Sequence, residues 1–169
     1  MTTSISTATT TYTRTHTATY LADAVLGTIS EILAHLGIPL SNGSLDWARD
    51  AMAIAAWIEE ESLQEVVLEC HRPDGTVLPI FEFPVRYTTD VIGDAAFTTS
   101  TASLAKYRAK IQSVPTATRF QLLCSFRTNC STQPGWSAGT RSSIAGLRSS
   151  TFGTIASGPH AAAAMRYLH

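Results

Sequence analysis

The pentapeptide Gly135-Trp136-Ser137-Ala138-Gly139 has the G-x-S-x-G pattern that exposes a nucleophilic serine between a strand and a helix in α/β hydrolases. The surrounding residues argue against that chemistry, because Pro134 stands directly before the motif and a Thr-Arg-Ser-Ser run follows it. The order serine, acid, histidine cannot be completed either, since no Asp or Glu follows Asp94. We therefore expect no serine hydrolase.

The other residue types that could do chemistry do not form a site. Glu65, Glu69 and Glu82 alternate with apolar residues and are expected on the solvent face of a hairpin, not as a paired acid and base. The three cysteines lack the close spacing of zinc ligands, and neither a P-loop nor a dinucleotide fingerprint occurs. We expect a protein that is not an enzyme and that needs no cofactor and no metal.

Charge is balanced overall but divided along the chain. Twelve basic against thirteen acidic residues leave a formal charge of −1. All thirteen acids lie at or before Asp94, so residues 1–94 carry −9 and residues 95–169 carry +8. We expect the two parts to attract each other inside one domain. A nucleic-acid-binding adaptor using the basic residues near 106–110 is the alternative, although their density is modest and no interleaved aromatic residues accompany them.

Two helices are predicted first, with spacings typical of helices that pack on a core. The first runs from about Ala18 to Leu36 and presents a wide apolar stripe. The second includes Trp47 to Ile58 and closes in Glu59-Glu60-Glu61, an acidic run that is either a solvated face or a contact for a partner's basic patch. Residues 1–16, rich in threonine, are expected to be a mobile arm or a strand borrowed by a sheet.

The spacing of apolar residues then changes from the helical period of 3.6 residues to the alternation of a strand, which predicts a β-hairpin between Leu63 and Tyr87. Pro79 and Pro84 cannot donate to a ladder, so the second strand should lie at an edge or contain a bulge. A third helix is expected over about 99–113 and a further strand over 119–128.

The last 40 residues combine scattered glycines with isolated apolar residues. This composition is typical of a segment that lies against a preformed core and can leave it. Trp136, Phe152 and Ile155 are candidate anchors or plain core residues, and Ala161 to Met165 could form a short helical turn.

This order of elements and three local strings resemble the bacterial HORMA-domain proteins of antiphage (CBASS) operons, relatives of spindle-checkpoint and meiotic HORMA proteins. The strings are Thr15-His16-Thr17-Ala18-x-Tyr20-Leu21-Ala22, the hairpin over residues 63–87, and Trp136-Ser137-Ala138-Gly139-Thr140-Arg141-Ser142. The resemblance implies an α+β fold, with three main helices packed on a mostly antiparallel sheet and a C-terminal safety belt. It divides the chain into an arm (1–16), a core (17–128), and a belt with tail (129–169).

The resemblance also implies a function. The safety belt would wrap a short closure-motif peptide that adds to the sheet as a strand. The closed form would bind and activate a cGAS/DncV-like nucleotidyltransferase, and an AAA+ ATPase would reopen it by engaging the N-terminal segment. The implied belt and peptide-binding residues are Trp136, Ser137, Gly139, Arg141, Phe152 and Ile155, and those for ATPase engagement are Thr9, Thr11 and Tyr12.

The sequence also sets expectations for location and assembly. A cytoplasmic protein is expected, since neither a secretory signal nor a long apolar run is present, and with it no membrane partner. The poorly matching residues 158–169 could serve as a closure motif for another copy, so self-association stays open.

Overall fold

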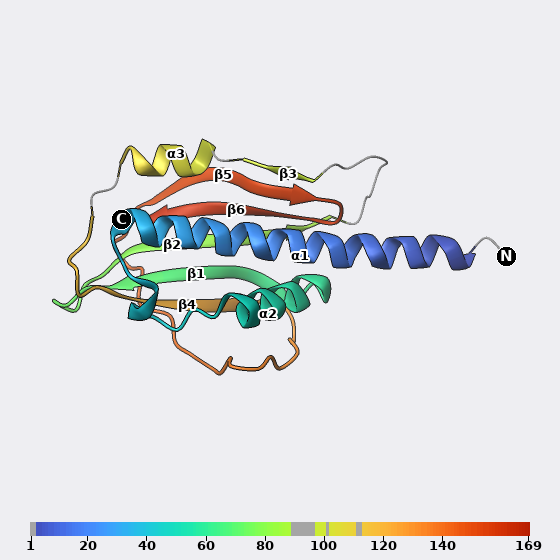
Figure 1. Ribbon diagram of the computed structural model, residues 1–169, viewed down its shortest axis with the longest axis horizontal. Helices are drawn as coiled ribbons and strands as arrows, with labels where there is room; N and C mark the ends of the chain where they lie inside the picture. The colour runs from blue at the N-terminus through green and yellow to red at the C-terminus, as the bar shows by residue number, and fades with distance from the viewer. Residues whose placement is uncertain (1–2, 89–96, 101, 111–112) are drawn as a thin grey trace.

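A computed structural model describes residues 3–88, 97–100, 102–110 and 113–169, including their side chains except at 3–12 and 103. Three helices cover one face of a six-stranded antiparallel sheet with strand order β3-β5-β6-β2-β1-β4 (Figure 1). The elements are, in chain order, α1 (Thr3–Leu36), η1 (Leu40–Asn42), α2 (Trp47–Glu59), β1 (Leu63–His71), β2 (Val77–Tyr87), β3 (Thr98–Thr99), α3 (Ala102–Arg108), β4 (Arg119–Phe126), β5 (Ser149–Gly158) and β6 (Ala161–Leu168).

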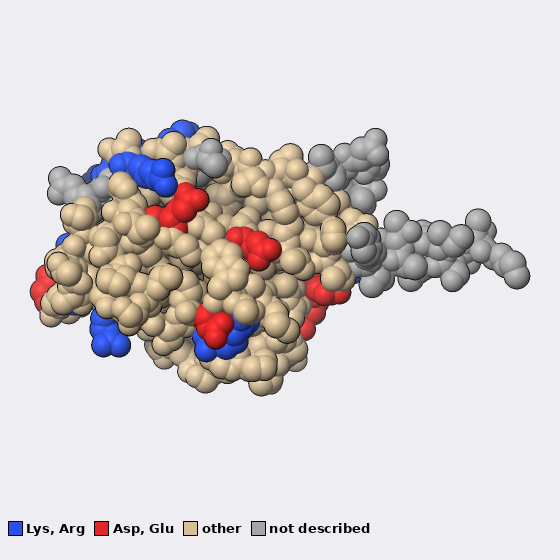
Figure 2. All heavy atoms as spheres, in the orientation of Figure 1, with Lys and Arg blue, Asp and Glu red and all other residues tan. Residues whose placement is uncertain are grey.

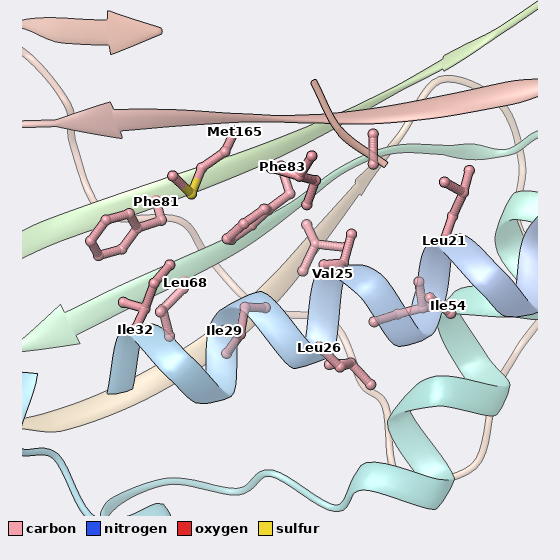
Figure 3. Packing of buried hydrophobic residues seen from close by; sticks show 14 of the residues in the cluster. Leu21, Val25, Leu26, Ile29, Ile32, Ile54, Leu68, Phe81, Phe83 and Met165 are labelled. Atoms are coloured by element: carbon pink, nitrogen blue, oxygen red, sulfur yellow. The ribbon is translucent and has the colours of Figure 1, made fainter. Parts of the chain in front are cut away.

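Helix α1 lies across the sheet and supplies much of the core. Figure 3 shows Val25, Ile29 and Ile32 of α1 directed at the strands, where they meet Phe81 and Phe83. The predicted stripe is confirmed, because its side chains are fully buried. Each such aliphatic side chain contributes about 1.5–3 kcal/mol of burial free energy. This stripe therefore fixes α1 to the sheet.

The N-terminal end of α1 differs from the sequence prediction. The expected arm over residues 1–16 lies partly outside the described residues, but from Thr3 onward the backbone is helical and continues into the buried part of α1. Each further residue adds a backbone hydrogen bond to a helix already nucleated over the core, so the polar, β-branched sequence can extend it. In Figure 1 this end projects beyond the sheet.

The predicted hairpin is confirmed as β1 and β2, but its second strand is not at an edge. β2 lies between β1 and β6 in the middle of the sheet. Pro79 falls where the β1–β2 register shifts, so the predicted bulge is present there. Pro84 stands opposite Glu65, within a gap in the β2–β6 pairing. The bulge and the gap allow both prolines in a central strand.

The C-terminal residues form a β-hairpin rather than a loose tail. β6 pairs with β5 on one side and β2 on the other. The helical turn expected at Ala161 to Met165 is therefore wrong, because pairing on both sides overrides the helix propensity of alanine. Residues 158–169 are not free to act as a closure motif in this state.

The third helix is shorter than expected and ends at Arg108. Its buried residues Leu104 and Tyr107 face the core. Residues 111–112, near the end of the expected helix, lie outside the described residues.

Candidate functional site

β4 is an edge strand whose outer side faces a cavity. Among the described strands it pairs with β1 alone, so the backbone N–H and C=O groups of its other edge are not used in the sheet. A free edge is a template for one more strand. Beside it lies a cavity of about 730 Å³, bounded by β4, by α2 and by residues 130–139.

The third wall of the cavity belongs to the β4–β5 connection, residues 127–148. Figure 1 shows this connection as a wide loop that extends beyond β4 before it enters the first residue of β5. It contains turns but no helix or strand. It therefore encloses the free edge of β4 without pairing with it.

Aromatic rings close the cavity on the helical side of the sheet. Trp57 of α2 meets Trp136 of the connection edge to face, with ring centroids 5.2 Å apart, and also meets Phe126 of β4 at 4.9 Å. The Trp57 indole Nε1 donates to the Ser131 carbonyl at 2.8 Å. Trp57 thus ties α2 to both the strand and the connection.

Two glycines allow the connection to pass close to Arg49 and to β4. Gly135 has φ +78°, and a Cβ there would lie 2.5 Å from Cδ of Arg49. A Cβ at Gly139 would lie 3.2 Å from Cδ2 of Leu123 on β4. The first position needs glycine for both its conformation and its space.

The start of the connection is held by the acidic run at the end of α2. Glu60 accepts hydrogen bonds from the Ser131 backbone N–H at 3.0 Å and from the Ser62 hydroxyl at 2.6 Å. Burial alone would raise the pKa of Glu60, but these hydrogen bonds lower it overall. Arg127 donates to the carbonyl of Glu61 at 2.7 Å.

The same run also reaches helix α1. The Thr15 hydroxyl donates to Glu59 at 2.7 Å, and Arg14 lies 3.8 Å from Glu61. Glu59 and Glu60 are exposed, as expected of a solvated face, and the run also joins α1, α2 and the connection through these contacts.

On the rear of the sheet, opposite the helices, the connection covers buried charges. Arg141 Nη1 lies 3.1 Å from Glu65 and 3.2 Å from Glu82, and Arg166 Nη2 of β6 lies 3.1 Å from each. Burial and the neighbouring Glu82 raise the pKa of Glu65, against the effect of the two arginines. Arg141 thus links the connection to β1 and β2, and Arg166 joins β6 to the same two carboxylates.

Next to this cluster, Ser142 fixes the connection to Glu69. The Ser142 backbone N–H and hydroxyl donate to the two Glu69 carboxylate oxygens at 2.8 and 3.0 Å. Leu147 then packs against a small apolar cluster on the rear face. The expectation that Glu65, Glu69 and Glu82 face solvent is wrong, because the connection covers them and leaves them 7%, 0% and 5% exposed.

The attraction expected between the acidic and basic parts of the chain is confirmed for four arginines. Arg108, Arg127, Arg141 and Arg166 all pair with acids from residues 1–94. Arg108 pairs with Glu31 on α1. The face in Figure 2 shows separate blue and red groups rather than a continuous basic surface. No observation of the described residues favours nucleic-acid binding.

The predicted site residues separate into four groups. Trp136, Ser137 and Gly139 line the cavity, whereas Arg141 lies behind the sheet. Phe152 and Ile155 are buried in the core on β5 and do not line the cavity. The side chains of Thr9, Thr11 and Tyr12 lie outside the described part of the chain.

Sequence reasoning missed Trp57, Arg166 and the role of Glu69. Each acts through a partner distant in the chain, and no local spacing announces such a contact. A tryptophan beside a helix's apolar stripe was the one available signal for Trp57.

Ser137 lies in an irregular segment rather than at a strand-to-helix turn. In the part of the chain that the structure describes, no group of His, Cys, Asp and Glu could hold a metal ion, and no helix is long and apolar enough to cross a membrane. Cys70, Cys124 and Cys130 are free thiols.

The family described as Bacterial HORMA domain 2 matches residues 6–169. No curated protein matches the sequence. A chain of the mitotic checkpoint complex superposes with a TM-score of 0.71 at 11% identity, covering 90% of this chain and 97% of the other. A chain of the E. coli MS115-1 HORMA:CdnC:Trip13 complex gives 0.59 at 13% identity, with 90% and 87% covered. C. elegans HTP-2 bound to the HIM-3 closure motif gives 0.54 at 15% identity, with 74% and 69% covered. The fold is that of these HORMA proteins.

Proposed function

The chain belongs to the bacterial HORMA domain 2 family, and we propose that it is a switch that encloses a closure-motif peptide between β4 and the β4–β5 connection. The peptide would add to the free edge of β4 as a strand, and the connection would be the safety belt. The observation that carries the proposal is an edge strand enclosed, but not paired, by a long connection.

The attachment of the belt supports a switch. The belt is held by hydrogen bonds and ion pairs at Glu60, Glu65, Glu69 and Glu82, while only a few of its side chains are apolar. Polar contacts can be replaced by contacts with water at a modest net cost in free energy, whereas exposing the apolar stripe of α1 to water costs much more. The belt can therefore leave the sheet while the core stays folded.

The partners follow from the structural neighbours. HTP-2 is bound to a closure motif, and the E. coli HORMA protein is in complex with CdnC and Trip13. By analogy, the closed form of this chain would bind and activate a cGAS/DncV-like nucleotidyltransferase in antiphage defence. An AAA+ ATPase would engage the projecting end of α1, around Thr9, Thr11 and Tyr12, and reopen it. The protein would act in the cytoplasm and would not be an enzyme.

Peptide binding is tested by selection from an mRNA-displayed library of random dodecapeptides on the intact protein. We expect enriched peptides that bind in fluorescence polarisation, and equal binding to Met52→Ala, a variant at an exposed α2 residue outside the cavity. Failure to enrich any binding peptide would contradict the proposed function.

The partners are tested by the genes that flank this one. A nucleotidyltransferase gene and an AAA+ ATPase gene are expected beside it. The purified nucleotidyltransferase should bind the peptide-loaded protein and make more product with it than alone. A nucleotidyltransferase that neither binds the peptide-loaded protein nor makes more product with it would contradict this partner.

A further inference from the structure

The indole N–H of Trp136 is buried and has no hydrogen-bond acceptor. Of the residues that line the cavity and are described by the structure, no other has a buried side-chain polar atom without a partner. The neighbouring Trp57 shows the contrast, because its Nε1 donates to Ser131. Buried indole N–H groups usually have an acceptor, so an acceptor for Trp136 is expected from whatever fills the cavity.

The cavity wall offers no free charge to a ligand. Its charged residues in the described chain are Arg49 and Asp50, which pair with each other at 2.9 Å. Arg49 also donates to the Ser44 carbonyl at 3.0 Å, and Asp50 accepts from the Asp46 N–H at 3.0 Å. A charged ligand side chain enclosed here would lose its water without gaining a partner.

The two sides of the cavity differ in the space they offer. A strand added to β4 alternates its side chains between the helical face and the rear face. On the helical face stand the rings of Trp57 and Trp136. On the rear face Gly139 of the belt lies close against Leu123, and Ser137 and Ala138 precede it in the cavity wall. A large apolar side chain therefore finds aromatic rings to pack against on the helical face, whereas the close approach of Gly139 to Leu123 favours small residues on the rear.

We propose that this site selects an uncharged extended peptide that places a large apolar side chain against Trp57 and Trp136, small residues on the rear, and a hydrogen-bond acceptor at Trp136 Nε1. This inference rests on the proposed peptide-binding function. Trp136 would be the residue that recognises the peptide, by accepting its apolar side chain and donating to its acceptor.

The selected dodecapeptides test the composition. We expect one position occupied by a large apolar residue, with small residues at the positions before and after it and no conserved charge in that trio. Replacing the apolar residue by Lys or Glu should weaken binding at least 100-fold in fluorescence polarisation. Enriched peptides with a conserved charged residue in this trio would overturn the inference while leaving peptide binding intact. Failure to enrich any peptide would contradict both.

The hydrogen bond is tested in solution with the best selected peptide. On ¹⁵N-labelled protein the Trp136 indole N–H resonance, assigned by comparison with Trp136→Phe, should shift downfield and exchange more slowly when the peptide binds. The resonance of Trp47, which lies outside the cavity, should not move. Trp136→Phe should weaken binding about threefold to tenfold, and Trp47→Phe should not. An unmoved Trp136 resonance in the complex would overturn the assignment of Trp136 as a donor.

Discussion

Arg141 of the safety belt lies 3.1 Å from Glu65 of β1, on the sheet face opposite the helices. The belt thus reaches across the rear of the sheet to a carboxylate that it also shields from water. Arg166 approaches the same carboxylate from β6. The position of the β4–β5 connection is therefore held in part by a charge cluster distant from the cavity beside β4.

Removing the belt's charge from this cluster should weaken the closed state. Arg141→Met leaves Glu65 and Glu82 with Arg166 alone, and we expect a loss of about 1–3 kcal/mol in the free energy of unfolding by urea, since Arg141 is partly exposed. Arg148→Met, at an exposed arginine of the same connection, should change it by less than about 0.5 kcal/mol. Equal stability of the two variants would show that the cluster does not hold the belt.

Gly135 allows the belt to cross Arg49. Gly135→Ala should destabilise the protein by about 1–3 kcal/mol, because it combines a positive φ with a Cβ 2.5 Å from the Arg49 side chain. Gly146→Ala is the matched control, since Gly146 has φ +81° in the same connection but nothing within 4 Å of its Cβ position. The difference between the two variants in the free energy of unfolding by urea measures the cost of the contact with Arg49. Equal free energies would show that this contact does not restrict position 135.

Cys130 offers a chemical block of the cavity. It is exposed and lines the cavity, whereas burial raises the pKa of Cys70 to about 12 and also raises that of Cys124, which keeps both as unreactive thiols. Alkylation with a bulky fluorescent maleimide at pH 7 should modify Cys130 and abolish peptide binding. Cys130→Ser should bind peptide before and after the same treatment. Labelled wild-type protein that still binds fully would place the peptide elsewhere.

His160 should give the fold a pH dependence near neutrality. Burial lowers the pKa of His160 below its ordinary 6.5, Arg14 lowers it further, and Glu61 opposes them. The unfolded chain therefore takes up a proton more readily, so this contribution to stability is present above pH 6.5 and is lost as the pH falls toward the folded pKa.

A variant isolates that contribution. His160 has φ 78°, which asparagine tolerates, so His160→Asn should keep the turn between β5 and β6. Between pH 7 and 5 the wild type should lose more unfolding free energy than His160→Asn. Parallel curves would show that His160 does not titrate differently in the two states.

The parts of this fold that are encoded locally were predictable. The α1 stripe and the β1–β2 hairpin rest on the periodicity of neighbouring residues, and both are confirmed. Glu69 was wrongly predicted to face solvent, because Ser142, which covers its carboxylate, comes from a segment far along the chain. Ala161 to Met165 became a strand because β2 and β5 supply partners on both sides.

The site was predictable to a similar degree. Trp136 was identified from an apolar residue in a glycine-rich segment, and it lines the cavity. Its neighbour Trp57 could not be identified, since their contact depends on how the belt folds back over α2. Local patterns therefore indicated Trp136, whereas the other two candidate anchors, Phe152 and Ile155, are core residues of β5, and the path of the connection is set by long-range packing.

A bound peptide should become the strand beside β4. Amide hydrogen exchange can be followed by NMR, residue by residue, over Phe120 to Phe126 with and without a selected peptide. Alternate amides of β4, those directed away from β1, should exchange much more slowly in the complex, while the others keep their rates. A peptide that binds tightly and leaves every β4 amide unchanged would contradict it.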